Sequence, residues 1–94
     1  MNKFSLDNRT AIITGGAQGF GLAMTERFLR SGANVIIWDF DKLAVEKTEK
    51  KLNNSKLSSS IIDVTNFDQV SSQVKKLTKD KKIDIFINNA GIAG

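Results

Sequence analysis

The chain has 94 residues and a formal net charge of +4 at pH 7, and it contains no cysteine, histidine or tyrosine. A chain of this length forms one domain at most. Its 40% hydrophobic and 26% charged residues are typical of a globular protein rather than a disordered one. The missing residue types exclude a disulfide framework, a Ser-His-Asp or Cys-His nucleophile, and a metal site built on histidine or cysteine.

Lysines supply most of the positive charge and fall on the predicted outer faces and ends of two helices, as at Lys47, Lys50, Lys75 and Lys79. Solvated lysines near a helix C-terminus interact favourably with the helix dipole. No aromatic residues alternate with them to stack bases, so we expect no nucleic-acid binding. No apolar run approaches the roughly 20 residues that span a bilayer, and residues 1–5 do not resemble a signal peptide. We therefore expect a cytoplasmic protein without membrane contact.

The first half of the chain alternates apolar runs with a helical pattern. Residues 11–14 and 34–38 are nearly continuous in apolar, β-branched character, which is typical of parallel strands covered on both faces. Between them, the pattern predicts a helix from about Gly19 to Ser31, which ends at Gly32.

The second half continues the alternation. Asp41 is the expected N-cap of a helix that ends at residues 53–55, and residues 60–63 are expected to form a third strand. A third helix is predicted by apolar residues at helical spacing, and residues 83–88 are predicted to form a fourth strand. The apolar residues of the third helix are Phe67, Val70, Val74 and Leu77. Its start resembles a capping box, with Thr65 as the cap and Asp68 in place of the usual glutamate.

Strands that alternate with helices imply right-handed crossovers and a parallel sheet. The predicted fold class is α/β, a partial Rossmann-like doubly wound sheet with strand order 3-2-1-4, truncated after the fourth strand. The sequence ends at Gly94 with no helix to cover that strand. We interpret residues 1–94 as the N-terminal portion of a larger protein or as a truncated reading frame.

A glycine-rich segment, residues 14–21 with the sequence TGGAQGFG, joins the first strand to the first helix. Glycines allow a sharp turn and a close approach of the backbone to a ligand. The unpaired amides and partial positive charge of the following helix N-terminus favour a phosphate. The segment therefore predicts a nucleotide site, although glycines at this position also serve close helix–strand packing.

Asp39 stands at the end of the second strand, 18 residues beyond Gly21. An acidic residue at this place and spacing accepts hydrogen bonds from the adenosine ribose hydroxyls of a dinucleotide. The alternative is an ordinary loop carboxylate. A carboxylate here would repel a 2′-phosphate, and neither Gln18 nor Phe40 supplies a positive charge, so NAD is preferred over NADP. Lys42 is the nearest cation and leaves NADP open.

Three motifs together resemble the N-terminal half of the short-chain dehydrogenase/reductase family. Residues 14–21 match its T-G-x-x-x-G-x-G motif, residues 88–91 match its N-N-A-G motif, and Asp63-Val64 matches the aspartate-plus-apolar pair after the third strand. The match covers nearly all 94 residues. It implies the following cofactor-binding residues: Gly15, Gln18, Gly19, Phe20, Gly21, Asp39, Phe40, Asp63, Val64, Asn89, Ala90 and Gly91.

The resemblance also implies what these residues do. Gln18 and Phe20 would meet the ribose and the pyrophosphate, and Asp39 would hold the adenosine ribose. Asp63 would hydrogen-bond the adenine amino group, while the Val64 backbone contacts the ring. Residues 89–91 would lie along the nicotinamide-side ribose. The same motif also fits a turn that tethers strand four to strand one through Thr14, and both interpretations can hold together.

The family's catalytic serine, tyrosine and lysine lie beyond residue 94, so the resemblance assigns no catalytic residue to this chain. The complete protein is expected to be a homo-oligomeric NAD(P)-dependent oxidoreductase that moves hydride between nicotinamide and a carbonyl or secondary alcohol. The 94 residues alone are expected to be inactive. Ketoreductases of acyl thioesters, polyol dehydrogenases and steroid-type alcohol dehydrogenases all remain open. The alternative is a non-catalytic NAD(P)-binding module or a decayed gene product.

Overall fold

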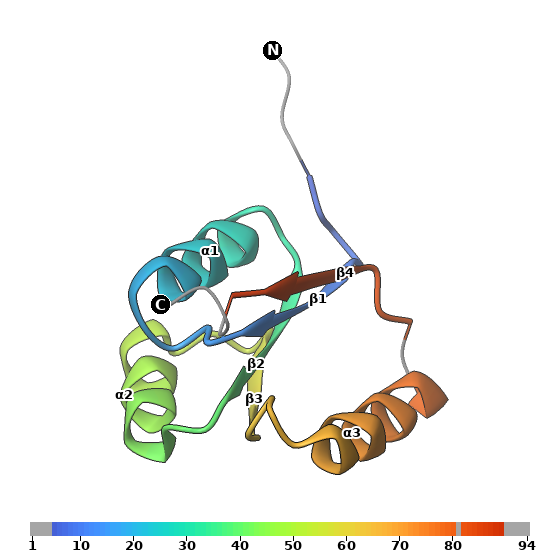
Figure 1. Ribbon diagram of the computed structural model, residues 1–94. Coiled ribbons are helices and arrows are strands. Elements are labelled where there is room, and N and C mark those ends of the chain that lie inside the picture. The colour runs from blue at the N-terminus through green and yellow to red at the C-terminus, as the bar shows by residue number, and fades with distance from the viewer. Residues whose placement is uncertain (1–4, 81, 90–94) are drawn as a thin grey trace.

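The computed structural model describes residues 5–80 and 82–89, in which strands and helices alternate along the chain (Figure 1). The elements are β1 (Thr10–Thr14), α1 (Gly19–Arg30), β2 (Asn34–Asp39), α2 (Lys42–Leu52), β3 (Leu57–Ile61), α3 (Phe67–Asp80) and β4 (Ile85–Asn88). The strands form one parallel sheet in the order β3-β2-β1-β4. The predicted α/β class and strand order are confirmed.

β1 is one of the two inner strands, and every one of its residues is buried. It pairs with β2 from Thr10 opposite Asn34 to Thr14 opposite Trp38, and Thr14 also lies opposite Asn88 of β4. Because the three strands run in the same direction, their carboxyl ends meet at one edge of the sheet. The loops that follow β1, β2 and β4 therefore begin side by side.

Helices α1 and α2 cover one face of the sheet and α3 lies on the other (Figure 1). Alternate residues of β1 and β2 point to opposite faces, so each strand contributes to two cores. On the face of α1 and α2 the core contains Ile13, Val35, Ile37 and Val45. On the face of α3 it contains Ile12, Ile36, Trp38 and Ile62. This two-sided burial explains why the two strands are apolar without alternation.

The third and fourth strands differ in extent from the prediction. β3 was expected at residues 60–63 but spans Leu57–Ile61, and β4 begins at Ile85 rather than at residue 83. β3 is an edge strand whose serines are exposed or half-buried, so its extent is determined by pairing with β2, from Val35 to Asp39, rather than by apolar character. A search for apolar runs therefore finds only the end of this strand.

Only two of the four apolar residues that predict α3 pack against the core. Val70 and Leu77 pack against the core beneath the helix. Phe67, the first residue of the helix, is 79% exposed, and Val74 is also exposed. The periodicity therefore identified the helix correctly, although two of its four apolar side chains are exposed.

Helix capping follows the prediction for α1 and α2 but not for α3. The carboxylate of Asp41 accepts a hydrogen bond from the Ala44 amide at 3.1 Å, and α1 ends before Gly32 with φ +95°. At α3 the capping box is wrong, because Asn66 accepts the bond from the Gln69 amide at 3.1 Å. The Thr65 hydroxyl instead donates to Asp63 at 2.6 Å.

Asp84, the residue before β4, is hydrogen-bonded to the first residue of β1. Its backbone N–H donates to the Thr10 carbonyl at 2.9 Å, and its carboxylate accepts from the Thr10 N–H at 2.9 Å. Arg9 and Lys82 lie 3.5 and 3.7 Å from the same carboxylate. The hydrogen bond from Thr10, followed by the two positive charges, holds the pKa of Asp84 below its ordinary value, against the opposing effect of burial.

This arrangement predicts a pH-dependent effect of Asp84→Asn. A lowered pKa in the folded state means that the charged carboxylate stabilises the fold above the ordinary aspartate pKa of about 3.9 and loses that effect as the pH falls. In thermal denaturation of the full-length protein, we expect Asp84→Asn to lower Tm at pH 7 and to lower it by less at about pH 3, where the stabilising effect of the charge has begun to be lost. Glu46→Gln, which changes an exposed carboxylate on α2, is the control. An equal Tm difference at both pH values would contradict the prediction.

Candidate functional site

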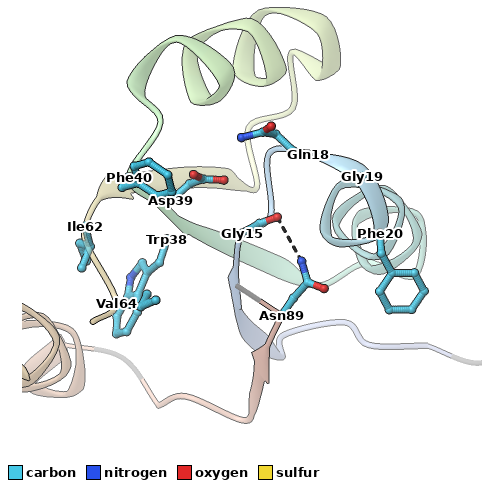
Figure 2. Close-up of a pocket in the computed structure, with 10 residues that line it drawn as sticks. All are labelled: Gly15, Gln18, Gly19, Phe20, Trp38, Asp39, Phe40, Ile62, Val64 and Asn89. Atoms are coloured by element: carbon cyan, nitrogen blue, oxygen red, sulfur yellow. Dashed lines mark hydrogen bonds between the residues drawn. The ribbon is translucent and has the colours of Figure 1, made fainter. Parts of the chain in front are cut away.

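A cavity of about 490 Å³ opens at the carboxyl edge of the sheet, between the β1–α1 loop, the end of β2 and the segment after β3 (Figure 2). Its volume lies in the usual range for small-molecule and cofactor sites. It is lined by Gly15, Gln18, Gly19, Phe20, Trp38, Asp39, Phe40, Ile62, Val64 and Asn89. The structure thus brings most of the predicted cofactor residues to one place.

Some predicted residues do not line the cavity, and two lining residues were missed. Gly21 lies behind the loop and Asp63 on an exposed turn, while Ala90 and Gly91 are outside the described residues. Trp38 and Ile62 were not predicted. Each directly precedes a predicted position or pair, Asp39 and Asp63-Val64, but their apolar character indicated only core packing.

The glycines of the β1–α1 loop are required for different structural reasons. Gly15 and Gly19 have φ values of +65° and +51°, which side-chain-bearing residues rarely adopt. A Cβ at Gly19 would meet no atom within 4 Å, so the space in front of it is open. A Cβ at Gly21 would overlap the Gly15 carbonyl and lie 2.6 Å from Asn89 Nδ2. Gly21 therefore allows the loop to pack against the start of α1.

The N-terminus of α1 is left free to bind an anion. Its N-cap, Gln18, has an extended backbone and makes no capping hydrogen bond with its side chain, and no acidic residue stands in the first turn. Within the described part of the chain, the amides of Gly19, Phe20 and Gly21 donate no hydrogen bond. Unpaired amides and the helix dipole together favour an anion at this position, and binding of a cofactor phosphate here stays a prediction.

Asp39 places a buried carboxylate beside the cavity. The residue is 5% exposed, and its Oδ1 accepts a hydrogen bond from the Asp41 amide at 3.0 Å. Asp41 caps α2, as the sequence predicts, and Asp39 is the last residue of β2 rather than part of the loop. The side-chain amide of Gln18 donates to Asp41 Oδ2 at 3.4 Å, which links the glycine loop to the start of α2.

Apolar side chains form the remaining wall. Trp38 is fully buried, and its ring stands edge-on to that of Phe86 with centroids 5.6 Å apart. Ile62 and Val64 continue this wall, whereas Phe40 is 75% exposed at the rim (Figure 2). An apolar wall next to a carboxylate suits a ligand that combines a flat ring with hydroxyl groups.

Asp63 occupies a turn of its own beside the cavity. Its Oδ1 accepts hydrogen bonds from the Thr65 hydroxyl at 2.6 Å and from the Thr65 amide at 2.9 Å. These bonds hold the pKa of Asp63 below the usual aspartate range, against a small opposing effect of desolvation. Its carboxylate is therefore charged at neutral pH. Contact with an adenine amino group stays a prediction.

The tether predicted between strands four and one is confirmed. The Thr14 hydroxyl lies 3.3 Å from the Ile87 carbonyl and 3.2 Å from Asn88 Oδ1, and it accepts the Asn89 amide at 2.8 Å. The Asn89 side chain donates to the Gly15 carbonyl at 3.4 Å (Figure 2). Asn89 thus links β4 to the glycine loop.

Across residues 5–80 and 82–89, no group of three or more histidine, cysteine, aspartate or glutamate side chains is placed to hold a metal ion. Over the same residues, none of the helices has the length and apolarity required to cross a bilayer.

Comparison with known proteins identifies relatives of the whole described region. The family model for short chain dehydrogenases matches residues 9–94. A 3-oxoacyl-[acyl-carrier-protein] reductase, FabG, from Chlamydia muridarum is 41% identical over 91 residues, which make up 93% of this chain and 37% of that protein. The chain thus spans about a third of the length of the curated relatives that it matches.

Solved structures show the same fold. The Pseudomonas aeruginosa RhlG/NADP active-site complex superposes with a TM-score of 0.84 at 30% identity, over 97% of this chain and 38% of that one. The 3-ketoacyl-(acyl-carrier-protein) reductase from Brucella melitensis complexed with NADH has a TM-score of 0.78 at 34% identity, over 87% of this chain and 34% of that one.

Gly19 and Gly21 have different surroundings, which predicts that replacing each with alanine will destabilise the protein to a different extent. In Gly21→Ala the added Cβ collides with backbone, so we expect a loss of about 2 kcal/mol or more in the free energy of unfolding. In Gly19→Ala the space is open and only the positive φ is strained, so we expect a loss of about 1 kcal/mol. Urea denaturation of the full-length variants measures both. A greater loss in Gly19→Ala than in Gly21→Ala would contradict the description of the loop.

Proposed function

The chain belongs to the short-chain dehydrogenase/reductase family, and we propose that it is the N-terminal cofactor-binding portion, residues 1–94, of an NAD-dependent oxidoreductase. One observation carries the proposal: the free N-terminus of α1 and the buried carboxylate of Asp39 border the same cavity. A phosphate site and a ribose-binding acceptor on one cavity are the two polar requirements of an adenine dinucleotide.

The residues present fit such a cofactor in size, charge and shape. The amides of Gln18, Gly19 and Phe20 would bind the pyrophosphate, for which the open space before Gly19 leaves room. Asp39 would accept the ribose hydroxyls, and the wall that contains Ile62 and Val64 would pack against adenine. The nicotinamide ring would supply the hydride chemistry, and this chain's residues would hold the other half of the molecule.

We further propose NAD rather than NADP as the preferred cofactor. Asp39 Oδ1 already accepts the Asp41 amide, and the Asp41 carboxylate lies within reach of the Gln18 side chain, so a 2′-phosphate would enter a region with two negative charges. Among the related structures, RhlG carries NADP and the Brucella melitensis reductase carries NADH, so the family includes both cofactors.

The reaction follows from the family rather than from residues of this chain. We propose hydride transfer to or from a carbonyl or secondary alcohol, with the serine, tyrosine and lysine of catalysis located outside residues 1–94. The name of the Chlamydia muridarum relative supports an acyl-thioester ketone as the first substrate to examine. A homo-oligomeric state and a cytoplasmic location belong to the same proposal.

Titration of the full-length protein with NAD and NADP, followed by an assay of NADH oxidation with a β-ketoacyl thioester, a keto sugar and a ketosteroid, tests the function. We expect binding of NAD and oxidation with at least one ketone. Cofactor binding without turnover of any carbonyl compound would favour a non-catalytic binding module. Failure to bind either dinucleotide would overturn the proposal.

The cofactor preference predicts the effect of Asp39→Ala. Removing the carboxylate abolishes repulsion of the 2′-phosphate and the acceptor for the ribose hydroxyls, so the ratio of kcat/KM with NAD to that with NADP should fall by about tenfold or more. Steady-state kinetics with both cofactors measures the ratio. Asp68→Asn on α3, away from the cavity, is the control. An unchanged ratio in Asp39→Ala would show that another residue selects the cofactor.

A further inference from the structure

Three consecutive carbonyl groups of the glycine loop are each held by a side chain from a different element. Asn89 donates to the Gly15 carbonyl at 3.4 Å. Thr25 of α1 donates to the Gly16 carbonyl at 3.0 Å, and Thr48 of α2 donates to the Ala17 carbonyl at 3.1 Å. Both threonines are buried, at 0% and 4% exposure, so neither can contact a ligand in the cavity directly.

These bonds fix the direction of the amides on the other side of each peptide plane. In a trans peptide the C=O and the next N–H point in opposite directions, and no peptide in the described chain is cis. The Ala17 carbonyl points to α2, so the Gln18 N–H points away from α2. Within the described residues, the amides of Gly16, Ala17 and Gln18 have no hydrogen-bond partner.

We propose that Thr48, assisted by Thr25, is a positioning residue for cofactor binding: its hydroxyl holds the Ala17–Gln18 peptide so that the amides around Gln18 are preset for the pyrophosphate. This inference rests on the proposed function. Thr48 stands 31 residues from its partner, on a helix that contributes no lining residue to the cavity. It acts on the ligand only through the backbone of the loop.

The hydroxyl, rather than the shape of the side chain, carries this role. Valine has nearly the same volume as threonine but cannot donate, so it would leave the Ala17 carbonyl buried without a partner. The peptide would then gain by rotating toward water or another donor, and the Gln18 amide would turn with it. Thr25 has a second acceptor, the Gly21 carbonyl of its own helix at 2.9 Å, so its single proton is shared between two carbonyls. Thr48 has no such alternative among the bonds described and is the better residue to test.

The test uses full-length Thr48→Val and Thr48→Ser with two competitive ligands, ADP-ribose and adenosine. Only ADP-ribose carries the pyrophosphate. In Thr48→Val we expect about fivefold weaker binding of ADP-ribose and a similar rise in the KM for NAD, the effect of losing one hydrogen bond of average strength. The inhibition constant of adenosine and kcat should change by less than about twofold, and Thr48→Ser should behave as wild type.

Thr78→Val is the matched control, because its hydroxyl donates to the Val74 carbonyl within α3. It should leave all four quantities unchanged. Equal binding of ADP-ribose by wild type and Thr48→Val overturns the role of Thr48. Equal losses for ADP-ribose and adenosine also overturn it, because they indicate general structural damage.

A second variant covers the case in which Thr48→Val does not fold. Thr25→Val removes the donor to the Gly16 carbonyl of the same loop and should produce the same selective loss of ADP-ribose affinity. If the affinities for ADP-ribose and adenosine both fall, or if neither falls, the proposal is overturned. Failure of the wild-type protein to bind NAD or NADP would overturn the proposed function itself. Normal binding by the wild type and by both variants would overturn only the positioning role.

Discussion

The site depends on one constraint: β1 is buried on both faces and paired in parallel on both edges. A strand in this position cannot shift its register without moving the core on each side of the sheet. Its last residue, Thr14, is therefore fixed beside Trp38 of β2 and Asn88 of β4. The glycine loop therefore begins at a fixed position. Asp39 and Asn89 lie beside it because each stands at the end of a strand that is paired with β1.

The polar side chains at this edge of the sheet supply hydrogen bonds to the backbone of the glycine loop, which has no regular secondary structure to provide them. Backbone carbonyls directed into the protein require donors, and the loop obtains them from Asn89, Thr25 and Thr48. The amides on the other side of the same peptides receive no partner within the described chain. The loop is thus satisfied on its inner side and left open on its outer side. An anion that enters the cavity completes the hydrogen bonding that the fold leaves undone.

The sequence indicated those features that have a local cause. The apolar runs of β1 and β2, the glycine segment and Asp39 at a strand end all follow from neighbouring residues, and the structure places them as expected. The missed features have distant causes. β3 is recognisable only through its pairing with β2, because three of its residues are serines. Thr48 resembles any other polar helix residue until the fold brings it to a carbonyl 31 residues away.

Helix α2 connects the two polar parts of the cavity, although it lines neither. At its N-terminus, Asp41 caps the helix and donates its amide to Asp39 Oδ1. Two turns later, Thr48 holds the Ala17 carbonyl of the loop. One rigid helix, anchored in the core by Val45, therefore sets both the orientation of the carboxylate and that of the loop amides. The distance between the Asp39 carboxylate and the loop amides is thus fixed by packing of α2 on the sheet, so we expect core substitutions beneath α2 to change the geometry of the cavity even though α2 does not line it.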